Sequence, residues 1–269
     1  MRFYLGPPNA AVSSFATIRC KTLYKLQQKL YIRILFNFLF IFFTLQLTAQ
    51  TEGFGTWDNF SARFVLNKKW DALLEGQLRS QKVVYDFSNY EYRASLLFHF
   101  PNEVSVLGGM GRFVSFQPDG NFKDPIINDE FRVWEQFIMN SHIGIVRLEH
   151  RYRLEQRFTS LLGYRNRFRY RLNAIIPFQH KAVENKTFYA SIFNELMVSN
   201  EGPYFEQNLI FAGIGYQFSR HVSFLGGYIN RFVNVTAANQ YSKNFFQTNF
   251  LFTIDTHQNG NRRNHNSLE

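Results

Sequence analysis

The chain has 269 residues, a formal net charge of +10, and contents of 45% hydrophobic, 18% aromatic and 19% charged residues. Phe occurs 32 times and Tyr 14 times, an excess of rings that favours a barrel facing lipid, with its aromatic girdles, over a water-soluble domain. The single cysteine, Cys20, precedes the predicted cleavage point after Ala49. The mature chain therefore has neither a disulfide scaffold nor a cysteine nucleophile or thiolate metal site.

The amino-terminal segment has the pattern of a secretory signal peptide. The first acidic residue of the whole chain is Glu52, so the segment before it is basic. An apolar run over 34–47 follows the basic residues of this segment. This run is shorter than the roughly 20 residues of a membrane-spanning helix and ends in small residues, which predicts a signal over 1–49, with an uncleaved anchor as the alternative. Cleavage after Ala49 lowers the formal charge from +10 to +4, because six basic residues and no acidic residue leave. These residues are Arg2, Arg19, Lys21, Lys25, Lys29 and Arg33.

After the signal, the sequence repeats a strand of about ten residues followed by a polar turn, which is typical of a transmembrane β-barrel. In the second segment, for example, Trp70, Leu74 and Leu78 alternate with Asp71 and Glu75. The expected strands are 60–66, 70–79, 90–100, 104–114, 129–139, 142–158, 162–176, 187–198, 206–218, 222–232 and 243–254. Bacterial single-chain barrels have even strand numbers, so we predict an all-β antiparallel barrel over 50–255 with about 12 strands, or 10 as the alternative. A short missing strand is expected within 51–57.

The gaps between these strands differ in length. The longer gaps, at 80–88, 115–128, 199–205 and 233–242, are expected on the extracellular side, and the shorter gaps on the periplasmic side. The tail over 256–269 has no apolar periodicity and is expected to be disordered.

Two neighbouring segments, 147–158 and 164–176, place arginine at nearly every second position. A strand sends alternate side chains to opposite faces, so the arginines share one face and the rings and leucines share the other. Arginine on a lipid-facing surface costs about 2–4 kcal/mol at the membrane midplane, and these rows should therefore face the lumen. The two rows contain Arg147, Arg151, Arg153, Arg157, Arg165, Arg167, Arg169 and Arg171, with Glu149 and Glu155 among them.

So many arginines in a low-dielectric interior would repel one another unless acids lie between them. We expect the facing strands to supply these acids and further cations, which are Glu75, Arg79, Glu91, Arg93, Glu130, Arg132 and Glu195. Structural filling of a narrow barrel is the first interpretation, and an anion-selective constriction is the second. Nucleic-acid binding requires rings on the same face as the charges, and here they alternate.

The order of motifs resembles the family catalogued as domain of unknown function 2490. The motifs are "LEGQLR" at 74–79, "EFRVWEQF" at 130–137, "RLEHRYRLEQRF" at 147–158, "RNRFRYRL" at 165–172, "FNELMV" at 193–198, "FEQNLIFAGIGYQF" at 205–218 and "GGYINRF" at 226–232. The resemblance implies a secreted bacterial outer-membrane β-barrel with no established activity. The family usually continues "FEQN" with arginine, where this chain has Leu209, so its lumen network lacks one cation there.

No motif of a hydrolase, zinc protease or nucleotide-binding loop occurs in the sequence. Ser95 and His99 share one face of one strand, but their separation of roughly 13 Å prevents a direct hydrogen bond. Asp119, Asp124, Asp129 and Glu130 lie around one acidic loop that could bind a divalent cation. Their spacing does not match a calcium loop, so a solvated loop is the expectation. The pairs "GGMG" at 108–111 and "GGY" at 226–228 are expected to relieve crowding where strands bend.

The sequence thus predicts a non-enzymatic structural or transport barrel in the outer membrane of a Gram-negative envelope, with no metal and no cofactor. Its expected partners are outer-membrane lipid, the barrel-assembly machinery during insertion, and small anionic or polar solutes if the lumen is open, with no nucleic acid. Two alternatives remain: a protein that binds ligands through its extracellular loops, and a lipid-modifying enzyme that uses His99, which no second catalytic group is expected to reach.

Overall fold

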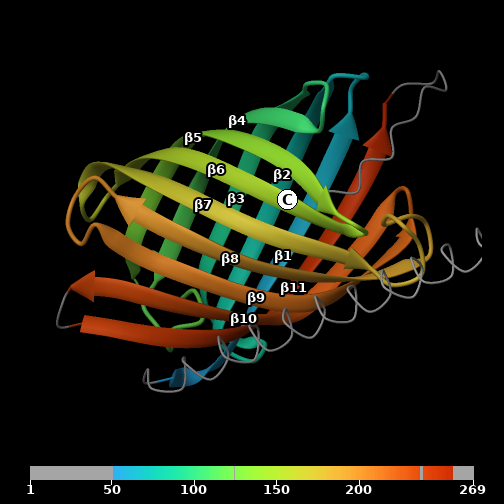
Figure 1. Ribbon diagram of the computed structural model, residues 1–269. Coiled ribbons are helices and arrows are strands. Elements are labelled where there is room, and N and C mark those ends of the chain that lie inside the picture. Colours follow the sequence, from blue (N-terminus) through green and yellow to red (C-terminus); the bar gives the residue numbers. More distant parts are fainter. Residues whose placement is uncertain (1–50, 124, 237–238, 257–269) are drawn as a thin grey trace, which may run out of the picture. The chain divides into compact units, whose positions relative to one another are not determined.

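The computed structural model describes residues 51–123, 125–236 and 239–256, which form a closed β-barrel (Figure 1). The predicted signal over 1–49 and nearly all of the predicted tail lie outside the described residues. The strands are β1 (Thr51–Val65), β2 (Trp70–Lys82), β3 (Tyr85–His99), β4 (Val104–Phe116), β5 (Ile126–Ile143), β6 (Val146–Thr159), β7 (Gly163–Pro177), β8 (Thr187–Ser199), β9 (Phe205–Ser219), β10 (Val222–Thr236) and β11 (Asn239–Asp255). Among the described residues, no helix is long and apolar enough to cross a membrane.

The barrel closes through a parallel pair of strands, and the predictions of 12 or 10 strands are wrong. Every other neighbouring pair is antiparallel, while β1 runs parallel to β11 with Phe60 opposite Phe250 and Phe64 opposite Ile254. The rings of Phe60 and Phe250 stack with centroids 5.4 Å apart. An even number follows only where the closing pair is antiparallel. The described residues form 11 strands, and residues 51–57 extend β1 instead of adding a strand.

Parallel closure also places the two ends of the described chain at opposite ends of the barrel. The end that holds Asp255, called the Asp255 end, carries the connections 66–69, 100–103, 144–145, 178–186 and 220–221. The opposite end, called the Thr51 end, carries 83–84, 117–125, 160–162 and 200–204.

The expected contrast between long and short gaps is wrong at 80–88, and it did not include the gap before β8. The long gap predicted at 80–88 is a turn at 83–84, because the strands on both sides extend into it. At the other end, the connection 178–186 is as long as the connection 117–125. Connection length therefore does not tell which end faces the cell exterior.

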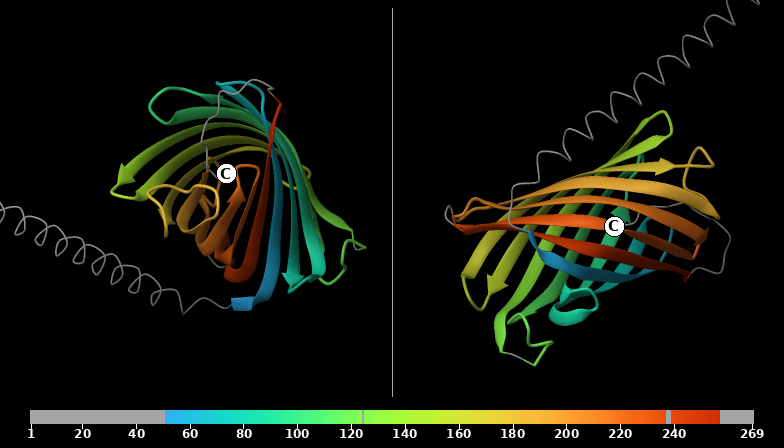
Figure 2. Two further views of the ribbon diagram at one scale, coloured as in Figure 1. Left: turned by 90° about the vertical axis from the view of Figure 1, so that its right-hand side faces the viewer. Right: turned by 90° about the horizontal axis from the view of Figure 1, so that it is seen from below.

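The left view of Figure 2 shows the strands surrounding the interior of the barrel. Along these strands, side chains alternate between the interior and the outer face. On β7, Arg165 and Arg167 are buried inside, whereas Tyr164 and Phe168 are 51% and 42% exposed outside. The outer face of the barrel is therefore rich in exposed apolar side chains, and the charged residues concentrate in the interior.

Glycine on β4 makes room for a large interior ring. A Cβ on Gly109 would lie 2.6 Å from the ring atom Cε2 of Trp134, which is buried. A Cβ on the neighbouring Gly108 would meet nothing within 4 Å. The expectation that the "GGMG" segment relieves crowding is confirmed at Gly109, where the indole lies against the backbone.

Candidate functional site in the barrel interior

The strands β6 and β7 carry the arginine rows into the interior. Their register places Arg151 opposite Arg171 and Arg153 opposite Arg169. Like charges directly opposite each other destabilise a sheet unless counterions intervene. None of the residues expected in the charged network is exposed, from Glu75 on β2 to Glu195 on β8. The interior must therefore supply a carboxylate for each close pair of guanidinium groups.

Glu155 on β6 is the most crowded of these carboxylates. Its Oε2 accepts hydrogen bonds from Arg167 Nε at 2.9 Å and Nη2 at 2.6 Å, and its Oε1 accepts one from Arg169 Nη1 at 2.7 Å. Arg132 and Arg153 lie 3.9 Å and 3.7 Å from its carboxylate oxygens. With 1% of Glu155 exposed, one buried negative charge is shared by four cations.

A second carboxylate, Glu130 on β5, links two arginines near the Thr51 end. Arg157 Nε donates to Glu130 Oε1 at 2.5 Å, and Arg132 Nε donates to the same oxygen at 2.6 Å. Arg157 also donates from Nη1 to Glu206 Oε1 at 3.0 Å. Because Glu206 is on β9, this guanidinium joins strands that are not neighbours across the interior.

Glu195 and Glu149 balance the middle of the rows. Arg151 Nη2 and Arg169 Nε both donate to Glu195 Oε1 at 2.8 Å. Arg171 Nη2 donates to Glu149 Oε1 at 3.0 Å. Bidentate and shared geometry of this kind suits the fixed donor fork of arginine, so lysine could not replace these arginines without loss of contacts.

The acids of β2 and β3 pair locally. Arg93 Nη2 lies 2.9 Å from Glu75 Oε1, and Arg79 Nη2 lies 3.4 Å from Glu91 Oε1. Both pairs are formed between neighbouring strands on the opposite wall from the arginine rows. Arg147 lies apart from the centre and lines a pocket at the Asp255 end.

Glu206 is a network residue that the alternation of the sequence did not indicate. The pairing of β8 with β9 shifts there, since Met197 is opposite Gln207 and Val198 is opposite Phe205. Glu206 is therefore the extra residue of a bulge, which turns its side chain inward between Arg157 and Arg167. A bulge changes the phase of the two-residue period. Strict alternation counted back from the interior residue Leu209 would place Glu206 on the outer face, whereas the bulge turns it inward.

Apolar side chains fill the interior on both sides of the charged network. One cluster, on β2 to β5, contains Leu73, Leu97, Leu107, Phe113, Trp134 and Ile138. The other contains Ile175, Val183, Tyr189, Phe193, Met197, Leu209, Phe211, Leu225, Ile229 and Phe245. Leu209, which follows the "FEQN" motif, packs in this second cluster.

Guanidinium groups lie over the faces of aromatic rings in the apolar parts of the interior. The Cζ atom of Arg132 lies 3.6 Å from the ring centroid of Phe113, and that of Arg79 lies 3.7 Å from a Trp57 ring centroid. Cation–π contacts of this length compensate part of the desolvation of a buried cation. The charged and apolar parts of the interior are thus in direct contact.

The centre of the barrel holds little free space. The cavity lined by Arg151, Arg153, Arg169 and Glu195 has a volume of about 100 Å³. A larger interior pocket of about 570 Å³ lies at the Asp255 end, lined by residues such as Ser105 and Arg147. Side chains therefore fill the middle of the barrel, and a pocket remains at this end.

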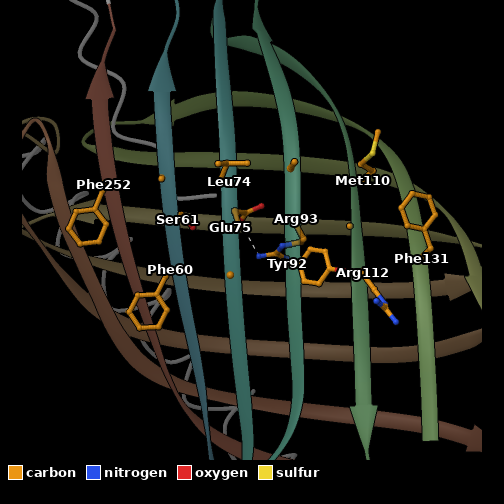
Figure 3. Close-up of a pocket in the computed structure, with 14 residues that line it drawn as sticks. Phe60, Ser61, Leu74, Glu75, Tyr92, Arg93, Met110, Arg112, Phe131 and Phe252 are labelled. Atoms are coloured by element: carbon orange, nitrogen blue, oxygen red, sulfur yellow. Dashed lines mark hydrogen bonds and ion pairs between the residues drawn. The ribbon is translucent and has the colours of Figure 1, made fainter. Parts of the chain in front are cut away.

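On the outer face, a shallow apolar groove of about 560 Å³ crosses β1 to β5 (Figure 3). Phe60, Leu74, Met110 and Phe131 line it. Arg112, at one border of the groove, forms an exposed ion pair with Asp129, to which it donates from Nε and from the terminal nitrogen Nη2. Small residues between the rings leave this depression in an apolar wall.

The acids of the loop after β4 do not converge on one point. Asp119 pairs with Lys82 Nζ at 2.9 Å, Asp129 pairs with Arg112 on the outer face, and Glu130 points into the interior. Asp124 lies outside the described residues. Within the part of the chain that the structure describes, no three His, Cys, Asp or Glu side chains are grouped as metal ligands.

His99 has neighbours that the sequence did not reveal, and the expectation that no second catalytic group reaches it is wrong. Its Nδ1 lies 3.0 Å from Ser105 Oγ, and its Nε2 lies 2.8 Å from Asp71 Oδ2. Both partners come from adjacent strands, so their proximity depends on sheet register and not on spacing along one strand. Ser95 lines the central cavity with a buried hydroxyl.

A family model described as "Protein of unknown function (DUF2490)" matches residues 54–242. This range covers every strand from β2 to β10. Comparisons with curated proteins and with solved structures gave no match.

Proposed function

The chain belongs to the DUF2490 family, and from this premise we propose that it is an outer-membrane β-barrel whose packed interior makes it a structural, non-conducting scaffold. In this proposal the protein reaches the envelope by a signal peptide cleaved after Ala49. Its partners are then outer-membrane lipid and, during insertion, the barrel-assembly machinery.

The distribution of apolar and charged side chains supports placement in a membrane. Large apolar residues are exposed on the outer face of strand after strand, such as Leu74, Met110, Phe168 and Ile214. Contiguous exposed apolar surface of this extent is unusual in a soluble monomer and matches a lipid-facing wall. The interior ion pairs remove the charges from that wall.

The charged network supports the non-conducting half of the proposal, and it is the observation on which the proposal depends. Glu130, Glu155 and Glu195 each bind at least two arginines, and the central cavity is only about 100 Å³. A path for solutes would have to break several buried pairs at once, and breaking one buried pair costs about 3–5 kcal/mol. An anion-selective pore is therefore the weaker alternative.

Planar-bilayer recording of the purified full chain tests this proposal. We expect no steady conductance above that of protein-free bilayers, for the protein as it is and for Arg167→Glu. A reproducible conductance whose anion preference is lost in Arg167→Glu would contradict the scaffold and support transport. Envelope fractionation tests the location, and recovery of the chain with soluble periplasmic proteins would contradict it.

A second candidate, binding through loops, is favoured by the folded state of the connection 117–125. Phe122 packs on Phe87 and Phe116 with ring centroids 5.9 Å and 5.2 Å apart, and its N–H donates to Phe87 O at 3.1 Å. A loop that is already ordered loses little conformational freedom when it binds. Deletion of 118–123 should then abolish partner capture by cells while the barrel stays heat-resistant on gels.

A further inference from the structure

Three side chains from consecutive strands form a hydrogen-bonded row at the Asp255 end of the interior. His99 Nε2 lies 2.8 Å from Asp71 Oδ2, and His99 Nδ1 lies 3.0 Å from Ser105 Oγ. Asp71 and His99 are buried, and Ser105 is half-buried. The register explains the row, because His99 is directly opposite Ser105 and Asp71 is opposite Leu97, two residues before His99.

The chemistry of the partners fixes where the protons lie. A carboxylate only accepts hydrogen bonds, so the Nε2–H of His99 donates to Asp71. A neutral imidazole then has its lone pair on Nδ1, and the hydroxyl of Ser105 donates to it. The row therefore has the order nucleophile, base and orienting carboxylate that activates a serine. The ring presents Nδ1 to the serine, and either imidazole nitrogen can take a proton.

The backbone around His99 holds this row in place. The N–H of His99 donates to Lys69 O at 2.8 Å, and the N–H of Phe100 donates to Val104 O at 2.8 Å. Two residues of the intervening turn, Asn102 and Glu103, have positive φ angles of 62° and 60°. A tight turn pinned at both sides limits the movement of His99 relative to Ser105, and preorganised geometry is what a catalytic pair requires.

Ser105 and His99 line the pocket of about 570 Å³ at this end. The volume falls within the range of about 300–1,000 Å³ that ligand pockets usually have. Leu97, Ile138 and Ile175 form an apolar part of its wall, and Ile138 is directly opposite Ser105. An apolar chain of a substrate can therefore occupy the pocket while its reactive group meets the hydroxyl.

Polar groups surround the same pocket toward solvent. Asn140 lies two residues beyond Ile138, which is directly opposite Ser105, so the amide is on the same interior face as the serine. Lys69 and Lys181 line the pocket from exposed turns. These side chains place N–H donors on the wall of the pocket and give it a polar mouth through which water can enter.

We propose that this pocket is an esterase site for carboxylic esters with an apolar acyl chain. Ser105 Oγ bonds to the carbonyl carbon while its proton passes to His99 Nδ1 and the carbonyl electron pair moves onto oxygen. The intermediate collapses with cleavage of the ester C–O bond, and the leaving alkoxide takes the proton from His99. Water then attacks the acyl-serine, gives a proton to His99, and releases the carboxylic acid with return of that proton to Ser105. Asp71 is a positioning residue. This inference does not depend on the non-conducting scaffold, because conductance and hydrolysis are measured separately.

The test uses the full chain purified in detergent micelles. We expect hydrolysis of p-nitrophenyl butyrate or p-nitrophenyl decanoate, and a fluorophosphonate probe should form a covalent adduct that peptide mapping places on Ser105. Ser105→Ala should lower turnover by about 10³-fold or more and abolish the adduct. Asp71→Asn should lower kcat by about 10³-fold to 10⁴-fold with little change in KM, since the imidazole loses the carboxylate that fixes its tautomer.

Ser95→Ala is the matched control, because Ser95 is also a buried interior serine but lines the central cavity, and its hydroxyl has no hydrogen-bond partner among the described residues. It should leave turnover and the adduct unchanged. Absence of an adduct on Ser105 in the unaltered protein, or turnover that persists in a folded Ser105→Ala variant, would overturn the proposal. The adduct map of the unaltered protein decides the question where a variant fails to fold.

Discussion

Replacement of Glu155 by glutamine tests how strongly the charged network stabilises the barrel. The substitution keeps the shape of the side chain and removes one negative charge that is 1% exposed and lies among four arginines. The amide nitrogen would point N–H donors at guanidinium donors, so the three hydrogen bonds at 2.6, 2.7 and 2.9 Å could not all be kept.

The size of the loss in stability depends on the ion pairs that the arginines around Glu155 keep after the substitution. Hydrogen bonds to charged groups contribute about 1.5–3 kcal/mol each, which gives an upper limit of about 4.5–9 kcal/mol for three. Arg167 keeps Glu206 at 3.3 Å and Arg169 keeps Glu195 at 2.8 Å, so the loss is smaller. We expect the free energy of unfolding to fall by about 3–5 kcal/mol, as for other buried charges that lose a partner.

Urea unfolding in detergent or lipid vesicles, followed by tryptophan fluorescence, measures this change, since Trp134 is buried in the interior. Glu184→Gln is the control, because Glu184 is exposed in the connection 178–186, outside the strands. That variant should change the free energy of unfolding by less than about 1 kcal/mol. Equal effects of the two substitutions would refute the view that interior pairs hold the barrel together.

Two other predictions concern packing and closure. Gly109→Ala should lower the free energy of unfolding by about 1–3 kcal/mol, because its Cβ would overlap the ring of Trp134. The control Gly108→Ala should not destabilise the barrel. Equal urea midpoints of the two variants would count against the packing described. Epitopes inserted before Thr51 and after Asp255 should differ in their accessibility to protease on intact cells, because β1 and β11 run parallel; equal accessibility would contradict parallel closure.

Local alternation was sufficient to predict the barrel and the interior location of the arginine rows. The two-residue period between Arg165 and Arg171 is unbroken, and β7 has no bulge in its pairing with β6. The sequence could not predict the closing pair, because β1 and β11 are separated by the whole barrel. A rule based on antiparallel closure then led from the eleven recognised segments to an even number.

Residues that depend on register or on bulges were the ones missed. Glu206 turns inward through a bulge, and the row of Asp71, His99 and Ser105 joins three strands whose relative register the sequence does not specify. Interior leucines such as Leu73 and Leu97 were also overlooked, since a lumen assumed to be aqueous does not predict apolar clusters there. The errors at Glu206 and at the row of Asp71, His99 and Ser105 share one physical cause, which is that pairing between strands is decided by contacts far apart in the sequence.

Labelling of single cysteines on β8 tests most directly whether the rings face lipid while the interior is closed. Cys20 is the single cysteine of the sequence, so in a Cys20→Ala background Leu196→Cys on the outer face and Ser191→Cys in the interior report alone. In lipid vesicles, a membrane-soluble maleimide should react at 196, and neither this probe nor a water-soluble maleimide should react at 191. Ready reaction of a water-soluble probe at 191, or reaction of position 196 with that probe alone, would contradict a sealed barrel whose outer wall lies in lipid.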